Sequence, residues 1–325
     1  MARRDVIAIG GSLGAVDAVR RLLRDLPGDL RAAIAIAIHV GAEGNNLLAS
    51  VFDSETAMSV GTAEDGETMQ PGRVYVAPAD RHLLAIDGVL RLGSGPRENM
   101  ARPAIDPLFR SVAVSHGPRA IAVVLTGMLN DGASGLADVK RCGGVTVVQS
   151  PADAVAADMP WSALQTADVD FRAPISDMAA LLVKLVAEEA GPTVEAPPEI
   201  NSEVRIALGR RADSETIAHF SDPAALARPA CGGVLDEVKR TPLRFRCQVG
   251  HAYTAGALAS VKEGALHEAI RVALRIMEER TLLAEKMAEE ARRAGRSAAA
   301  RSYDRRAGET RDQADVLRRA IGSGG

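Results

Sequence analysis

Between Val6 and about Glu189 the sequence alternates short runs of β-branched residues with longer amphipathic stretches. This alternation is typical of βαβ units, in which a helix crosses over between two parallel strands. It predicts an α/β fold built on a doubly wound, mostly parallel sheet. The runs that we interpret as buried strands are residues 6–9, 33–38, 74–77, 120–125 and 145–149.

One stretch departs from this alternation. Residues 82–86 and 89–92 are apolar runs separated by Asp87-Gly88, a dipeptide that favours the tight turn of a β-hairpin. We therefore expect an antiparallel hairpin as an excursion from the parallel sheet.

The character of the chain changes near residue 190. The stretch from Ala190 to Glu199 contains three prolines and has no hydrophobic period, which indicates a linker. Residues 262–293 and 297–321 have near-heptad apolar spacing on either side of Gly295, so they predict an antiparallel helical hairpin. We expect an α/β domain at 1–190, a linker at 191–227, a small module at 228–258 and the helical hairpin at 259–325.

Composition argues against several classes of function. Aromatic residues make up only 3% of the chain and the net charge is −3, which disfavours a nucleic-acid partner bound through aromatic stacking. No apolar run approaches the roughly 18 residues of a membrane helix, so we expect no membrane insertion. Three cysteines are too few for a disulfide framework, which favours the reducing cytoplasm.

The turn after the first predicted strand is the first candidate for chemistry. Gly10-Gly11-Ser12-Leu13-Gly14 leads directly into a predicted helix, and a tight strand-to-helix turn of this kind can expose a serine nucleophile beside backbone N–H groups. Ser12 as an ordinary helix N-cap is an equally open interpretation. A nucleotide-binding turn fits less well, because the loop has neither the G-x-G-x-x-G order nor a Walker lysine.

Two further polar residues follow predicted strands. His39 comes directly after the second strand, and Asp131 lies in a glycine-rich loop after residues 120–125. Because ligands of open α/β sheets bind at the carboxyl edge of the strands, His39 is well placed as a base, and Asp131 as its orienter or as a helix cap. Together with Ser12 they form the set needed for acyl transfer. Their order along the chain differs from that of the α/β-hydrolases.

These residues stand in segments that resemble, in the same order, the catalytic domain of chemotaxis protein-glutamate methylesterases. The resemblance covers about residues 5–188. The segments that carry it are Ala8-Ile-Gly-Gly-Ser-Leu-Gly14, Ile36-Ala-Ile-His39, Val76-Ala-Pro-Ala-Asp-Arg-His-Leu83, Arg102-Pro-Ala-Ile-Asp-Pro-Leu-Phe109, Leu125-Thr-Gly-Met-Leu-Asn-Asp-Gly-Ala133, and Val148-Gln149 with Met159-Pro160.

The resemblance implies Ser12 as nucleophile, His39 as base and Asp131 as orienter, with the region of Met128 at the oxyanion site. Leu13 stands where the family commonly has a small or hydroxylated residue. We therefore expect the chemistry to be retained, with an altered catalytic rate or an altered shape of the opening of the site. The resemblance is to a stand-alone member, without the phosphorylation-controlled receiver domain that the family normally carries at its N-terminus.

The implied substrate is a γ-glutamyl methyl ester, or in some members a glutamine, on a chemoreceptor-like signalling protein. A methyltransferase or a sensor kinase is a further expected partner in receptor adaptation, and we expect no cofactor. Two alternatives stay open: a catalytically weak adaptor that binds receptors or sensor kinases through the same domain, and a hydrolase of small esters.

The C-terminal module is similar to the small module of some stand-alone members of the family. It contains Cys231, Cys247 and His251, but Arg228 occupies the place of the first ligand. Structural zinc sites use four protein ligands, so we expect a degenerate, metal-free zinc-ribbon-like module. We also expect that deleting residues 200–325 leaves esterase activity within a few-fold of that of the full chain.

Overall fold

A computed structural model describes residues 2–39, 47–210, 221–228, 232–239, 242–247 and 249–322. The chain divides into two compact units, Met1–Leu258 and Ala259–Gly325. Each is described by itself.

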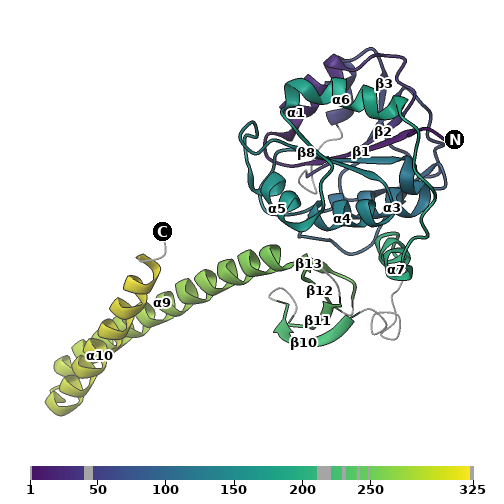
Figure 1. Cartoon of the computed structure of the whole chain (residues 1–325). Helices are drawn as coiled ribbons and strands as arrows, with labels where there is room; N and C mark the ends of the chain where they lie inside the picture. Colours follow the sequence, from purple (N-terminus) through teal and green to yellow (C-terminus); the bar gives the residue numbers. More distant parts are fainter. Residues whose placement is uncertain are drawn as a thin grey trace. The chain divides into compact units, whose positions relative to one another are not determined.

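The first unit is built around a seven-stranded sheet in which every neighbouring pair is parallel (Figure 1). Its strands stand in the order β3-β4-β2-β1-β7-β8-β9. Strands β1, β2, β7 and β8 are buried along their whole length, as expected of a parallel sheet covered on both faces. The bounds are β1 Val6–Gly11, β2 Ala33–Ile38, β3 Ser59–Thr62, β4 Arg73–Val76, β7 Ala120–Val124, β8 Val145–Gln149 and β9 Phe171–Ala173.

Helices cover both faces of this sheet (Figure 1). Ile7 and Ile9 of β1 pack in one apolar core with residues of α1 and α6, whereas Ala8 packs with α3 and α4 in a second core. Alternate residues of one strand thus face opposite layers. The bounds of the helices are α1 Ala15–Asp25, α2 Leu48–Asp53, α3 Ile105–His116, η1 Gly117–Arg119, α4 Ala133–Arg141, α5 Asp158–Thr166 and α6 Ile175–Ala187.

The fold class predicted from the sequence is confirmed. The chain leaves β1 for β2 on one side and later returns as β7 on the other side of β1, so a topological switch point lies at β1. The short edge strands β3 and β9 were not predicted, because neither has an apolar run of the kind that marks the buried strands.

The expected hairpin is also present. Strand β5 (His82–Ile86) pairs antiparallel with β6 (Val89–Gly93) as a separate two-stranded sheet. Asp87 and Gly88 have positive φ angles of 51° and 78°, as a two-residue hairpin loop with φ above zero at both positions requires.

Residues 191–227 differ from the linker that the prolines suggest. They contain helix α7 (Pro198–Ala207), which starts on the last two prolines and buries Ile200 and Val204 against the α/β core. They also contain β10 (Ser221–Ala227). Proline is tolerated in the first turn of a helix, and for that reason a proline-rich stretch does not exclude one.

Strand β10 opens a small antiparallel sheet in the first unit. The order is β10-β11-β12-β13, with β11 at Val234–Val238, β12 at Arg244–Cys247 and β13 at Ala252–Thr254. We refer to this four-stranded sheet as the C-terminal ribbon.

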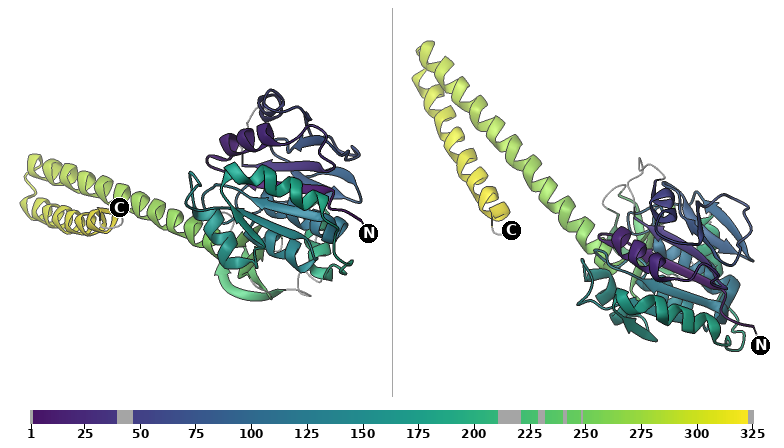
Figure 2. Two further views of the ribbon diagram at one scale, coloured as in Figure 1. Left: turned by 45° about the horizontal axis from the view of Figure 1, so that its top comes forward. Right: turned by 90° about the horizontal axis from the view of Figure 1, so that it is seen from above.

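The second unit is a helical hairpin. Its first helix is α9 (Ala255–Arg293), and its second is α10 (Ser297–Gly322). The turn between them contains Gly295, which has a φ of 71°. Figure 2 shows the two helices side by side, and the ion pairs Arg292–Asp304, Glu285–Arg311 and Glu278–Arg318 join them in antiparallel register. No helix in the described residues is both long and apolar enough to cross a membrane.

Candidate active site

Ser12 lies in the turn between β1 and α1, at the switch point of the sheet. Its backbone N–H donates to the carbonyl oxygen of Thr126 at 2.9 Å, which ties the end of β1 to the loop after β7. The N-cap of α1 is Gly14, with a φ of 80° and no side-chain cap. The interpretation of Ser12 as an ordinary N-cap is therefore wrong.

His39 follows the neighbouring strand β2. Its backbone N–H donates to the carbonyl of Gly11 at 3.2 Å, and its ring Nε2 lies 2.6 Å from Oδ2 of Asp131. A carboxylate at Nε2 favours the tautomer that carries its proton there, which leaves Nδ1 as the basic ring nitrogen.

Asp131 is only 2% exposed and accepts several hydrogen bonds besides that of His39. The backbone N–H groups of Ile105 and Gly132 donate to it at 2.7 and 3.0 Å, and Nδ2 of Asn99 donates at 2.9 Å. Burial acts to raise the pKa of Asp131, but the hydrogen bond and charge of His39, followed by the other donors, outweigh it and hold the pKa below its usual range. The carboxylate is therefore ionised at neutral pH.

The same carboxylate caps helix α3. The N-cap residue Ala104 has no side chain that could bond the first turn, and Asp131 accepts from the N–H groups of Ile105 and Asp106 instead. A negative charge at a helix N-terminus is favourable. The sequence left open whether Asp131 contacts His39 or caps a helix, and this side chain does both. The helix that it caps is α3, not the helix that follows it in the chain.

A cavity of about 400 Å³ brings the three predicted residues together. Ser12, His39 and Asp131 line it together with Met128, and Arg97 and Arg102 also lie on its wall. Within the described part of the chain, the Ser12 hydroxyl makes no hydrogen bond to His39. Such contacts are often long in a ligand-free site and shorten when substrate binds.

The loop after β7 approaches Ser12 closely. A Cβ atom added to Gly127 would lie 2.9 Å from Cβ of Ser12 and 2.0 Å from Sδ of Met159, so only glycine fits there. In the described residues, no acceptor bonds the backbone N–H of Leu13 or of Met128. Leu13 follows Ser12 in the chain and Met128 lines the same cavity, so their N–H groups are candidate donors to an oxyanion.

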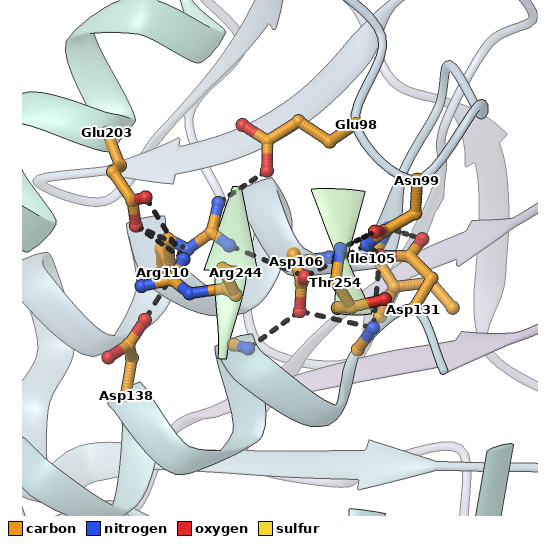
Figure 3. Close-up of polar contacts among 12 residues, drawn as sticks. Glu98, Asn99, Ile105, Asp106, Arg110, Asp131, Asp138, Glu203, Arg244 and Thr254 are labelled. Carbon is orange, nitrogen blue, oxygen red and sulfur yellow. Dashed lines mark hydrogen bonds and ion pairs between the residues drawn. The ribbon is translucent and has the colours of Figure 1, made fainter. Parts of the chain in front are cut away.

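A cluster of buried charged side chains lies beside Asp131, as Figure 3 shows. Arg110 of α3 binds Glu98 at 2.6 Å and Glu203 of α7 at 3.0 Å. Burial raises the pKa of Asp106 to about 7, against the charge of Arg110 and with added repulsion from Asp131. The sequence pattern did not reveal this cluster or Asn99, because neither forms a motif with periodic spacing.

The metal candidates of the C-terminal ribbon are described only in part. Sγ of Cys247 lies 3.5 Å from Nδ1 of His251, while Cys231 lies outside the described residues. Nε of Arg228 donates to the hydroxyl of Tyr253 at 2.8 Å. Among the described residues, the ribbon thus supplies two candidate ligands, whereas a structural zinc ion takes four.

The doubly wound sheet and its cluster of Ser12, His39 and Asp131 define an α/β enzyme-like domain with its site at the switch point. The particular family follows from sequence comparison. Residues 7–182, more than half of the chain, match the family described as CheB methylesterase, and the chain belongs to that family.

Individual curated relatives support this family assignment. The chain is 35% identical over 191 residues to a protein-glutamate methylesterase/protein-glutamine glutaminase 2 of Methanosarcina mazei, covering 56% of this chain and 52% of that protein. It is 41% identical over 169 residues to a protein of the same type from Yersinia pestis, covering 51% and 48%. The chain thus spans about half the length of the curated relatives it matches.

A solved structure matches the same region. The crystal structure of the Thermotoga maritima CheB methylesterase catalytic domain has a TM-score of 0.54 and 32% sequence identity, and covers 57% of this chain and 100% of that one. The similarity therefore concerns the α/β domain.

Proposed function

We propose that this chain is a serine-type esterase that hydrolyses γ-glutamyl methyl esters on a chemoreceptor-like signalling protein. The observation that carries the proposal is the 2.6 Å contact between His39 and the buried Asp131, in a cavity that Ser12 also lines. The names of the relatives, protein-glutamate methylesterase/protein-glutamine glutaminase, supply the chemical class of the substrate.

Acylation begins with proton transfer. Nδ1 of His39 takes the proton of the Ser12 hydroxyl as Oγ attacks the ester carbonyl carbon, and Asp131 stabilises the imidazolium that forms. The negative charge on the carbonyl oxygen is stabilised by the N–H groups of Leu13 and Met128. When the tetrahedral intermediate collapses, the C–O bond to the methoxy group breaks, and His39 returns its proton to release methanol.

Deacylation repeats these steps with water. His39 deprotonates the water, which attacks the acyl-enzyme carbonyl, and Ser12 leaves with the proton from His39. The product is a free glutamate carboxylate. With a glutamine side chain the leaving group is ammonia, so the same residues also support deamidation.

The wall of the cavity suits an acidic protein substrate. Arg97 and Arg102 line it, and both lie within ion-pair distance of the single carboxylate of Asp80. The two guanidiniums therefore carry more positive charge than Asp80 neutralises, which attracts a segment rich in glutamate.

A comparison of substrates tests the proposal against its alternatives. The full chain is incubated with a receptor fragment carrying methylated glutamates and, separately, with a small chromogenic ester, and methanol or chromophore release is measured. We expect a much higher kcat/KM for the receptor fragment. Faster turnover of the small ester would indicate a small-ester hydrolase, and binding of the receptor without methanol release would indicate an adaptor; either result would overturn the proposal.

A further inference from the structure

The outer edge of strand β13 meets the loop that precedes α3. Asn99 donates its backbone N–H to the carbonyl of Ala252 at 2.9 Å, and its side-chain Oδ1 accepts from the N–H of Thr254 at 2.9 Å. These two groups of β13 are two residues apart and point away from β12, which pairs with the other edge. Asn99 therefore extends the C-terminal ribbon toward the active site.

The other half of the Asn99 amide faces the catalytic carboxylate. Nδ2 donates to Oδ1 of Asp131 at 2.9 Å and to Oδ2 of Asp106 at 3.1 Å (Figure 3). An amide has one oxygen and one NH₂ group, so a donor on one side and two carboxylates on the other fix its orientation. The N–H of Thr254 thus determines which group Asn99 presents to Asp131.

A second contact reaches the loop of Asp131. The hydroxyl of Thr254 bonds Oδ1 of Asn130, the residue before Asp131. The first turn of α9 also packs on this side chain, since a Cβ added to Gly256 would lie 2.8 Å from Nδ2 of Asn130. Through Thr254 the ribbon therefore contacts both Asn99, which bonds Asp131, and Asn130, which precedes Asp131 in the chain.

Buried ion pairs hold the ribbon in this position. Arg246 of β12 binds Glu98 and Glu203, each at 3.2 Å, and Arg244 binds both carboxylate oxygens of Glu203 at 3.0 and 2.9 Å. All four side chains are almost completely buried. Breaking a buried pair leaves an uncompensated charge, so these contacts strongly oppose displacement of the ribbon.

We propose that the C-terminal ribbon is a working part of the esterase site, and that Asn99, oriented by Thr254, is a positioning residue for Asp131. The inference rests on the proposed function, because it concerns the same Asp131 and His39. It also argues against the expectation from sequence that residues 200–325 can be removed with little effect on activity.

The test uses the full-length chain and the methylated receptor fragment. Asn99 has a φ of 48°, so Asn99→Gly removes the amide without backbone strain. We expect its kcat per folded molecule to fall by about 10- to 100-fold, with KM changed less than about three-fold, because a hydrogen bond to a charged group is lost from the catalytic step rather than from substrate binding. The matched control is Asp87→Gly in the β5–β6 turn, also at a positive φ, which should retain wild-type kcat.

Substitutions of Thr254 separate its two contacts. Thr254→Pro removes both the hydroxyl and the N–H that orients Asn99, Thr254→Val removes only the hydroxyl, and Thr254→Ser keeps both, so the difference between proline and valine reports the N–H. We expect the loss of kcat to be largest for proline, smaller for valine and under about two-fold for serine. The folded fraction, measured by circular dichroism at the assay temperature, normalises every rate.

The outcomes are distinguishable. If the wild-type chain releases no methanol, the proposed function fails. If the wild type is active and Asn99→Gly keeps kcat within two-fold, or Thr254→Pro equals Thr254→Ser, this inference alone is overturned. A lower kcat at unchanged KM in Asn99→Gly, with Thr254→Pro below Thr254→Val, supports it.

Discussion

Asp131 performs two tasks with one carboxylate: it binds His39 and it caps α3. The two tasks use the same charge, since an ionised carboxylate both stabilises a protonated imidazole and satisfies the first N–H groups of a helix. In the proposed mechanism this residue links catalysis to stability, and a substitution there should affect both.

Asp131→Asn makes this link measurable. The amide has a single acceptor oxygen, so its NH₂ group must face at least one of the present donors. We expect turnover to fall by roughly 10³- to 10⁴-fold, because an asparagine holds the imidazole in the wrong tautomer. We also expect the free energy of unfolding, measured in urea, to fall by about 1–2 kcal/mol through the weakened cap. Unchanged stability would contradict the capping role, and near wild-type turnover would contradict the role toward His39.

At the scale of elements, three adjacent strands determine the site. Strands β2, β1 and β7 are neighbours in the sheet, and His39, Ser12 and the loop of Asp131, which follow their carboxyl ends, line the cavity together with residues of the loop before α3. This arrangement could be predicted from sequence, because polar residues after buried strands of a parallel sheet meet at one edge. The supporting residues could not, since the left-handed backbone of Asn99 and its contact with Ala252 depend on a strand more than 150 positions later.

The limits of prediction at this scale have physical reasons. The sequence predicted fewer strands than the seven of the sheet, because β3 and β9 lie at its edges, are only partly buried and lack a buried apolar run. Helix α7 was missed because its starting prolines resemble those of a linker. Nothing local in the sequence indicates that Glu203 of this helix meets Arg110, Arg244 and Arg246.

His82 connects β5 to the start of α3 and gives a pH-dependent prediction. Its ring is fully buried, with Nε2 3.0 Å from the carbonyl of Pro96 and Nδ1 accepting from the N–H of Ala104 at 3.3 Å. Burial lowers the pKa of His82 from 6.5. The unfolded chain therefore binds this proton more readily, and the free energy of unfolding should fall as the pH drops below about 6.5, with no contribution to the slope at higher pH.

The effect of His82 is isolated by comparing variants. We expect His82→Gln, which keeps one donor and one acceptor, to show a shallower loss of stability between pH 7 and pH 5 in urea titrations. His267→Gln on α9 should follow the wild-type slope. If all three slopes coincide, His82 does not couple protonation to unfolding.

At the scale of the whole molecule, the chain adds a ribbon and a helical hairpin to a CheB-type domain. We predict that the ribbon folds without zinc, because Arg228 is bonded to Tyr253 and leaves Cys247 and His251 without a full ligand set among the described residues. Elemental analysis should find well under one zinc per chain, and a chelator should leave the melting temperature unchanged. One equivalent of zinc that is lost in Cys247→Ser would contradict this prediction.

The rate of methanol release from a methylated receptor fragment, compared between the wild-type chain and Ser12→Ala, tests the central claim most directly. Ser176→Ala is the control, because the hydroxyl of this exposed serine at the start of α6 hydrogen-bonds its neighbour Asp177 and lies outside the cavity of Ser12. We predict that Ser12→Ala lowers the rate by several orders of magnitude, since removing one member of a catalytic set disables the others, whereas Ser176→Ala matches the wild type. A Ser12→Ala protein that keeps more than about a tenth of the wild-type rate would remove Ser12 from the role of nucleophile.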